Sequence, residues 1–170
     1  MTGIIKVDTI QNNGGTTGLE IDSSGRVSYP QLPAFFVTRS ASYGVSDAVG
    51  TIQLDTKQVD TANAFNTSTY TYTIPKAGLW MFNATLSATG LSASERYFGI
   101  DLHINGSTYM DLYENWHYGA TNAYMYVSLQ AMRECIVGDT VLLKYNNSDS
   151  GNFTLNHDSK RTKLMGWFLG

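Results

Sequence analysis

Apolar residues recur at every second position along much of this chain, and clusters of Gly, Asn, Asp and Ser interrupt them. In residues 79–88 five apolar side chains share one face of the pattern: Trp80, Phe82, Ala84, Leu86 and Ala88. A period of two is typical of half-buried β-strands. The 3.6-residue period of an amphipathic helix is nearly absent. The pattern therefore predicts an all-β protein.

Further strands are expected at 34–40, 51–55, 69–74, 97–104, 107–113, 122–133, 140–145 and 163–169. Asn105-Gly106 predicts a two-residue hairpin, because both residue types tolerate positive φ. Residues 146–152 (NNSDSGN) are expected to form a loop. Many short strands at regular spacing indicate a β-sandwich, and we expect a jelly roll.

The first 27 residues carry a separate, shorter alternation. Its apolar positions are Ile4, Ile5, Val7, Ile10, Leu19 and Ile21. Two strands of this size cannot bury a core by themselves. The segment therefore needs another surface, which could be its own domain, a sister subunit or a larger assembly. We expect an extended N-terminal β arm and linker at 1–32, with the six apolar residues as its contacts, and a head domain at 33–170.

Composition and charge narrow the range of partners. The chain has 170 residues, of which 15% are charged, and a net charge of −3, so no basic excess is available to neutralise the phosphates of nucleic acid. Apolar runs stay well below the ~20 residues of a membrane helix. The beginning of the chain shows no signal-peptide pattern, which predicts synthesis in a reducing cytosol. Cys135 has no partner for a disulfide, and we expect it to be a small buried residue.

Three short motifs in residues 33–170 follow the order of a known family. They are an opening strand, PAFFV at 33–37; a centre, IPKAGLWMF at 74–82; and an ending, GDTV at 138–141 followed by LMGWFL at 164–169. Together they resemble the globular head of the q subcomponent of the first complement component, a close relative of the tumour-necrosis-factor jelly roll. Trp80 stands where that family usually has Tyr, and Leu164 where it usually has Phe.

This resemblance implies a ten-strand-type jelly-roll sandwich that forms a homotrimer, has no enzymatic activity and serves in binding or display. Animal members are secreted, and a collagen stalk commonly precedes their globular head. The N-terminal segment of this chain has another sequence pattern. KVDTI at 6–10 and GLEIDSSGRV at 18–27 resemble the leaders that precede variable heads in structural proteins of tailed bacteriophages.

Residues 109–126 are unusually rich in aromatic side chains. The prominent ones are Tyr113, Trp116, Tyr118, Tyr124 and Tyr126. Aromatic residues bury large areas, and the apolar seam of a trimer needs such area. The alternative is a platform for a host-surface receptor or glycan. We favour packing over the platform.

No metal site, cofactor or catalytic centre is expected. The three histidines lie in different predicted elements without ligand spacing: His103, His117 and His157. Two carboxylate pairs could hold calcium only if loops brought their oxygens together: Asp111 with Glu114, and Asp55 with Asp60. No nucleophile elbow is present in the sequence.

These patterns together predict a structural virion protein of a tailed phage. It would be made in the host cytoplasm and displayed on the virion as a trimeric capsid decoration or cement knob. Its arm would attach it to the major capsid protein or to another virion protein, with no membrane insertion. Two alternatives stay open: a tail- or head-fibre tip that binds a host-surface receptor or glycan, and a soluble complement-type binding module.

Overall fold

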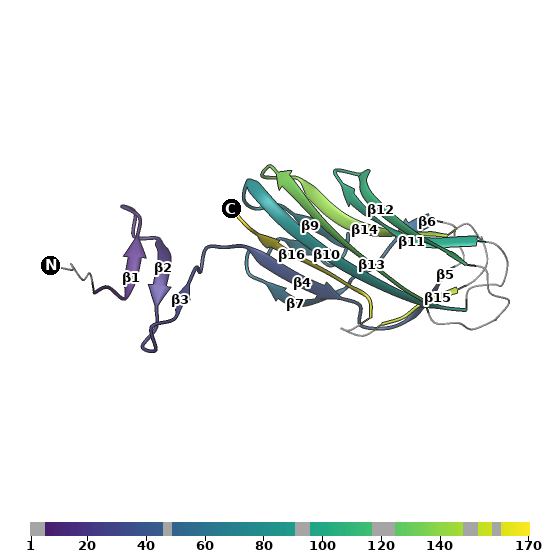
Figure 1. Ribbon diagram of the computed structural model, residues 1–170, viewed down its shortest axis with the longest axis horizontal. Helices are drawn as coiled ribbons and strands as arrows, with labels where there is room; N and C mark the ends of the chain where they lie inside the picture. Colours follow the sequence, from purple (N-terminus) through teal and green to yellow (C-terminus); the bar gives the residue numbers. More distant parts are fainter. Residues whose placement is uncertain (1–5, 46–48, 91–95, 117–124, 148–152, 158–160) are drawn as a thin grey trace. The chain divides into compact units, whose positions relative to one another are not determined.

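The computed structural model describes residues 6–45, 49–90, 96–116, 125–147, 153–157 and 161–170 (Figure 1). Within these residues every regular element is a β-strand, which confirms the all-β prediction. The same residues contain no helix that could cross a membrane. The chain divides into two compact units, Met1–Leu32 and Pro33–Gly170, which we call the N-terminal unit and the head.

The N-terminal unit is a three-stranded antiparallel sheet of β1 (Thr9–Gln11), β2 (Thr17–Ile21) and β3 (Val27–Ser28). The sequence pattern suggested only two strands. Asn12 and Asp22 close the two turns, since the side-chain oxygen of each accepts hydrogen bonds from two backbone N–H groups of its own turn.

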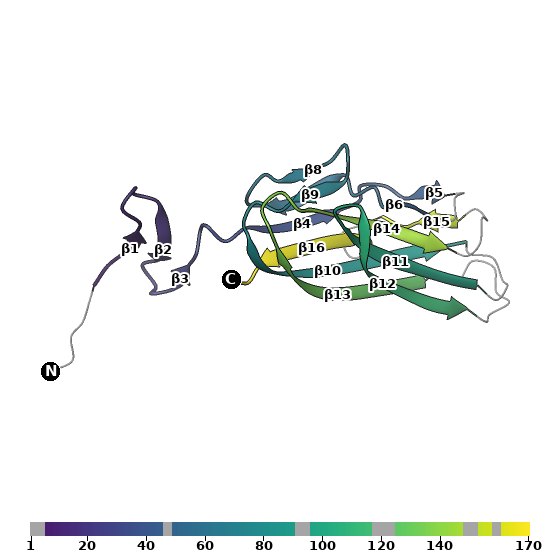
Figure 2. The same ribbon diagram turned by 90° about the horizontal axis from the view of Figure 1, so that it is seen from above.

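The head is a sandwich of two antiparallel sheets, seen from two sides in Figures 1 and 2. Sheet I contains β4 (Ala34–Thr38), β5 (Tyr43–Val45), β7 (Thr56–Asp60), β10 (Gly78–Thr89), β13 (Met125–Cys135), β15 (Phe153–Leu155) and β16 (Lys163–Phe168). Sheet II contains β6 (Val49–Thr51), β8 (Phe65–Asn66), β9 (Thr71–Thr73), β11 (Arg96–Ile104), β12 (Ser107–Trp116) and β14 (Thr140–Asn147).

The core lies between the two sheets and follows the predicted alternation. The five inward residues of β10, from Trp80 to Ala88, are all 0% exposed. Phe98, Ile100, Leu102 and Ile104 of β11 oppose them from sheet II and are at most 3% exposed. Cys135 is buried, as the sequence predicted.

The turn at Asn105-Gly106 is the predicted two-residue hairpin, with φ values of 53° and 78°. Its Asn also fastens a second turn: Asn105 Nδ2 donates to Asp139 Oδ1 at 2.7 Å, and the backbone N–H of Thr140 donates to Asn105 Oδ1 at 2.8 Å. Asp139 Oδ2 accepts from the N–H of Ile136 at 3.0 Å. One hairpin thereby supports the turn between β13 and β14.

The predicted strand at 51–55 is wrong. Strand β6 ends at Thr51 in sheet II, and β7 begins at Thr56 in sheet I. The N–H of Ile52 still donates to the Leu143 carbonyl of β14 at 2.9 Å, and the chain then crosses from sheet II to sheet I. Ile52 and Leu54 are nevertheless 0% exposed, so the apolar pattern reflects a buried crossover. The predicted loop at 146–152 is also shorter at its start, because β14 continues to Asn147.

Candidate functional site

An apolar patch covers part of the outward face of sheet I, where β13, β10, β16 and β4 lie side by side (Figures 1 and 2). Two rows of cross-strand partners form it. The first row is Met132, Met81, Trp167 and Ala34, and the second is Gln130, Asn83, Met165, Phe36 and Val59. We call these nine residues the outward patch.

The outward patch has large apolar side chains in contact with solvent. Met132 is 58% exposed, Val59 44% and Trp167 38%. The next row along the same strands is polar: Ser128, Thr85, Lys163 and Thr38. The apolar surface is thus confined to the end of the sheet where β4 begins and β16 ends. Large exposed apolar patches are typical of surfaces that bind other molecules.

Tyr109 of β12 joins the edges of the two sheets beside the outward patch. Its hydroxyl donates a hydrogen bond to the backbone carbonyl of Met132 at 2.7 Å, and the Arg133 guanidinium lies 4.7 Å from the centre of its ring. This contact ties β12 to β13, and Met132 of β13 is the most exposed apolar residue of the outward patch.

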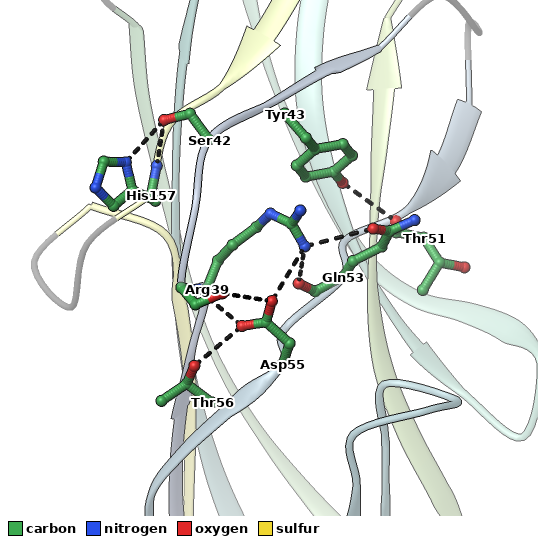
Figure 3. Close-up of polar contacts among 9 residues, drawn as sticks. Arg39, Ser42, Tyr43, Thr51, Gln53, Asp55, Thr56 and His157 are labelled. Carbon is green, nitrogen blue, oxygen red and sulfur yellow. Dashed lines mark hydrogen bonds and ion pairs between the residues drawn. The ribbon is translucent and has the colours of Figure 1, made fainter.

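A polar cluster holds the segment around the crossover (Figure 3). The Asp55 carboxylate accepts hydrogen bonds from the N–H and hydroxyl of Ser40 and from the Thr56 hydroxyl. Burial works against ionisation of Asp55, but these hydrogen bonds and the Arg39 charge at 3.6 Å outweigh it and lower its pKa. Arg39 also donates to the Gln53 carbonyl at 2.7 Å. The two opposite charges lie together inside the cluster, which gives it a structural role, although the buried Arg39 Nε has no hydrogen-bond partner among the described residues.

Ser42 and His157 form the arrangement nearest to a catalytic pair. The Ser42 hydroxyl lies 2.9 Å from His157 Nδ1, and its oxygen accepts a hydrogen bond from the His157 backbone N–H (Figure 3). Within the described residues no carboxylate is bonded to this ring, so the orienting group of a catalytic triad is missing there. The pair joins the segment before β5 to the segment after β15.

A cavity of about 320 Å³ lies beside this cluster and is lined by Tyr43, Gly44, Val45, Gly50, Thr51, Gln53, Tyr70 and Tyr145. Burial raises the pKa of Tyr43 to about 12, so its hydroxyl stays protonated at neutral pH. Gly50 is required here, because any side chain would overlap the Tyr145 hydroxyl.

The two carboxylate pairs considered for calcium are described only in part. Asp55 and Asp60 take separate partners: Asp60 accepts from the N–H groups of Ala64 and Phe65 and pairs with Lys57. Asp111 is exposed, and the side chain of Glu114 lies outside the description. Across the described ranges no group of three His, Cys, Asp or Glu residues could hold a metal ion.

The predicted contacts of the N-terminal segment fall into three groups. Val7 and Ile10 are exposed, at 40% and 55%. Leu19 and Ile21 are half-buried in β2. Ile4 and Ile5 lie outside the described residues.

The aromatic residues considered for a trimer seam or a receptor platform are described only in part. Tyr126 of β13 points outward and is 49% exposed, three rows from Met132 along the strand. Tyr113 and Trp116 belong to β12, but the structure does not describe their side chains. Tyr118 and Tyr124 lie outside the described residues.

The outward patch itself was missed by the sequence reasoning. From the sequence, only the inward residues of 79–88 were considered, and Met81 lies on the opposite face of the strand together with Asn83. A strand whose outer face changes from apolar to polar along its length is the signal that could have found it.

The sequence model of the C1q domain matches residues 34–169. Among solved structures, the globular domain of zebrafish complement 1qA protein superposes with a TM-score of 0.57 at 16% identity, covering 82% of this chain and 98% of that one. Eiger TNF from S. frugiperda gives 0.64 at 10% identity, covering 82% and 92%. Murine APRIL gives 0.58 at 11% identity, covering 82% and 100%. No curated protein sequence matches significantly.

Proposed function

This chain belongs to the C1q domain family, and we propose that it forms a homotrimer whose subunits meet through the outward patch. C1q and TNF-like domains are typically homotrimeric binding modules without enzymatic activity. The observation that carries the proposal is the row of Met132, Met81 and Trp167, three large apolar side chains in register on an uncovered sheet face. Covering them provides the apolar seam that a stable oligomer requires.

Substitutions of two exposed apolar residues, one on each sheet, test whether the subunits meet through the outward patch. We expect the Met132→Glu chain to run as an 18.7 kDa monomer in size-exclusion chromatography with light scattering, because a charge would be buried at the seam. Val49→Glu, on β6 of sheet II, should leave the trimer intact, since Val49 lies outside the outward patch. Circular dichroism confirms that both variants are folded. A monomeric parent chain at micromolar concentration would contradict the proposal.

The finer proposal concerns where the trimer works. It is displayed on the virion of a tailed phage as a capsid decoration or cement knob, attached through the N-terminal unit to the major capsid protein or another virion protein. Two observations support this: the resemblance of residues 6–10 and 18–27 to phage leaders, and the exposure of Val7. Three attachment segments per trimer raise the strength of a weak contact.

Deletion of residues 2–27 tests the attachment. The shortened chain should remain a folded trimer that no longer co-sediments with purified capsids. Continued binding would eliminate the N-terminal unit as the anchor. Electron microscopy of particles then separates head from tail locations.

The two alternatives give different results. For a fibre tip, Trp116→Ala should abolish adsorption of intact particles to cells. For a soluble complement-type module, which the family membership favours, purified virions should lack the protein.

A further inference from the structure

The N-terminal sheet has one apolar face and one polar face. The register pairs Ile10 with Leu19 and Ile21 with Val27, so these four side chains share a face. The opposite face carries Thr9, Glu20 and Ser28, also aligned in register. Ile10 and Val27 remain 55% and 51% exposed. Residues 6–32 form a single sheet, so this part of the chain contains no second layer to cover the apolar face.

We infer that this apolar face packs against the same face of two further copies of the chain, about the threefold axis of the trimer. The inference rests on the proposed homotrimer and adds the partner of the N-terminal sheet. A three-stranded sheet of this size gains independent stability only when its apolar face is packed. Three such faces around one axis provide a common core.

The junction between the two units supports this choice of partner. The head begins at Pro33, whose carbonyl accepts a hydrogen bond from the N–H of Phe168. The next residue, Ala34, is paired with Trp167 inside the outward patch. Each N-terminal unit therefore joins its head at the surface through which the heads meet. Trimerisation brings three junctions together and raises the local concentration of the three sheets to about millimolar.

The chemistry of the face also suits identical copies. The four aligned side chains are aliphatic and carry no charge, so they can pack about one axis without burying a charge of their own. The nearest carboxylate in this register is Asp8, whose carbonyl accepts from the Ile21 N–H at the start of β1. The one ionised side chain of β2, Glu20, lies on the opposite face and stays in solvent. A face that contacted an unrelated charged surface would not need its charged residues confined to the opposite face.

Cysteine cross-linking in the full chain tests the packing. The natural Cys135 is buried, so a thiol introduced in the N-terminal sheet is the reactive one. We expect Ile21→Cys to form an intersubunit disulfide under mild oxidation at least about tenfold faster than Glu20→Cys, its neighbour on the opposite face, because of the high local concentration. The rate should not depend on protein concentration. Ile10→Cys and Thr9→Cys provide a second matched pair.

Other outcomes distinguish this inference from the proposed trimer. Equal, slow cross-linking of both variants in a trimer of normal mass overturns the packing and leaves the trimer. A rate that rises with protein concentration places the contact between trimers and also overturns it. An Ile21→Cys thiol that neither cross-links nor reacts with a maleimide means that the head or another segment covers the face. A monomeric chain contradicts the proposed trimer itself.

Discussion

In the head, five successive inward positions of β10 are 0% exposed, whereas in the N-terminal unit Ile10 and Val27 are more than half exposed. Both units are antiparallel sheets with alternating apolar residues. The head has a second sheet to close its core, and residues 6–32 have one sheet only. The same alternation therefore builds a closed core in the head, whereas within residues 6–32 it leaves one apolar sheet face without a second layer. Substitutions placed at matched positions can separate these two cases.

The largest effect is expected from Phe82→Ala in the head core. Phe82 is 0% exposed and its ring lies parallel to that of Trp80, with centroids 6.2 Å apart. Its truncation should lower the free energy of unfolding by about 3–5 kcal/mol. Urea denaturation at a fixed protein concentration measures this. Ile10→Ala should change the unfolding of the head by less than about 0.5 kcal/mol. Comparable losses from the two variants would remove the distinction between the units.

Gly166→Ala should destabilise the head by about 1–3 kcal/mol, because overpacking forces neighbouring rings to move. An added Cβ at this inward position of β16 would overlap the ring of Phe35 and lie 3.0 Å from Phe82 Cδ1. Gly44 in β5 is the matched control, since a Cβ there meets nothing within 4 Å. Thermal unfolding of both variants measures the difference, and an equal effect at the two glycines would contradict the packing argument.

The sequence predicted the core of the head more completely than the outward patch, and the reason is physical. Inward positions such as Trp80 and Phe98 alternate without interruption, because core burial constrains every second residue. The crossover at 52–55 keeps buried apolar residues but lacks strand pairing, which local pattern cannot reveal. The outward patch joins residues from five strands, and only the register places Met132, Met81 and Trp167 in one row.

A smaller effect is expected at Asp139, which fastens the turn between β13 and β14. Asp139→Ala should lower the free energy of unfolding by about 1–3 kcal/mol at neutral pH, since it leaves the Asn105 amide and the Ile136 N–H without their acceptor.

The effect of Asp139→Ala should depend on pH, because these hydrogen bonds lower the pKa of Asp139 below its ordinary value of 3.8. The ionised form is thus the one that the fold favours. Its stabilisation is present above pH 3.8 and is lost as the pH falls through the lowered pKa. Denaturation of parent and variant at pH 7 and below pH 3 should show the difference shrinking; a constant difference would contradict the assignment.

The smallest effect on the head is expected at Asp22. Its carboxylate accepts hydrogen bonds within a turn of the N-terminal unit, as that of Asp139 does in the head. Backbone and side-chain hydrogen bonds from Arg26 lower the pKa of Asp22, as those from Asn105 and Ile136 do for Asp139. Asp22 is exposed, however, and its turn belongs to a sheet without a core of its own. Asp22→Ala should leave the melting temperature of the head unchanged.

The effect of Asp22→Ala should be local. Its turn bonds help to hold β2 and β3 together, so amide exchange at Ile21, whose N–H donates to the Asp8 carbonyl, should become faster. The increase should disappear at a pH low enough to protonate Asp22 in the parent chain. If the three sheets pack about one axis, the increase should also be smaller in the trimer than in the monomeric Met132→Glu chain, because packing against sister copies protects β2. Equal exchange in both backgrounds would mean that the N-terminal sheet gains nothing from trimerisation, whatever joins the heads.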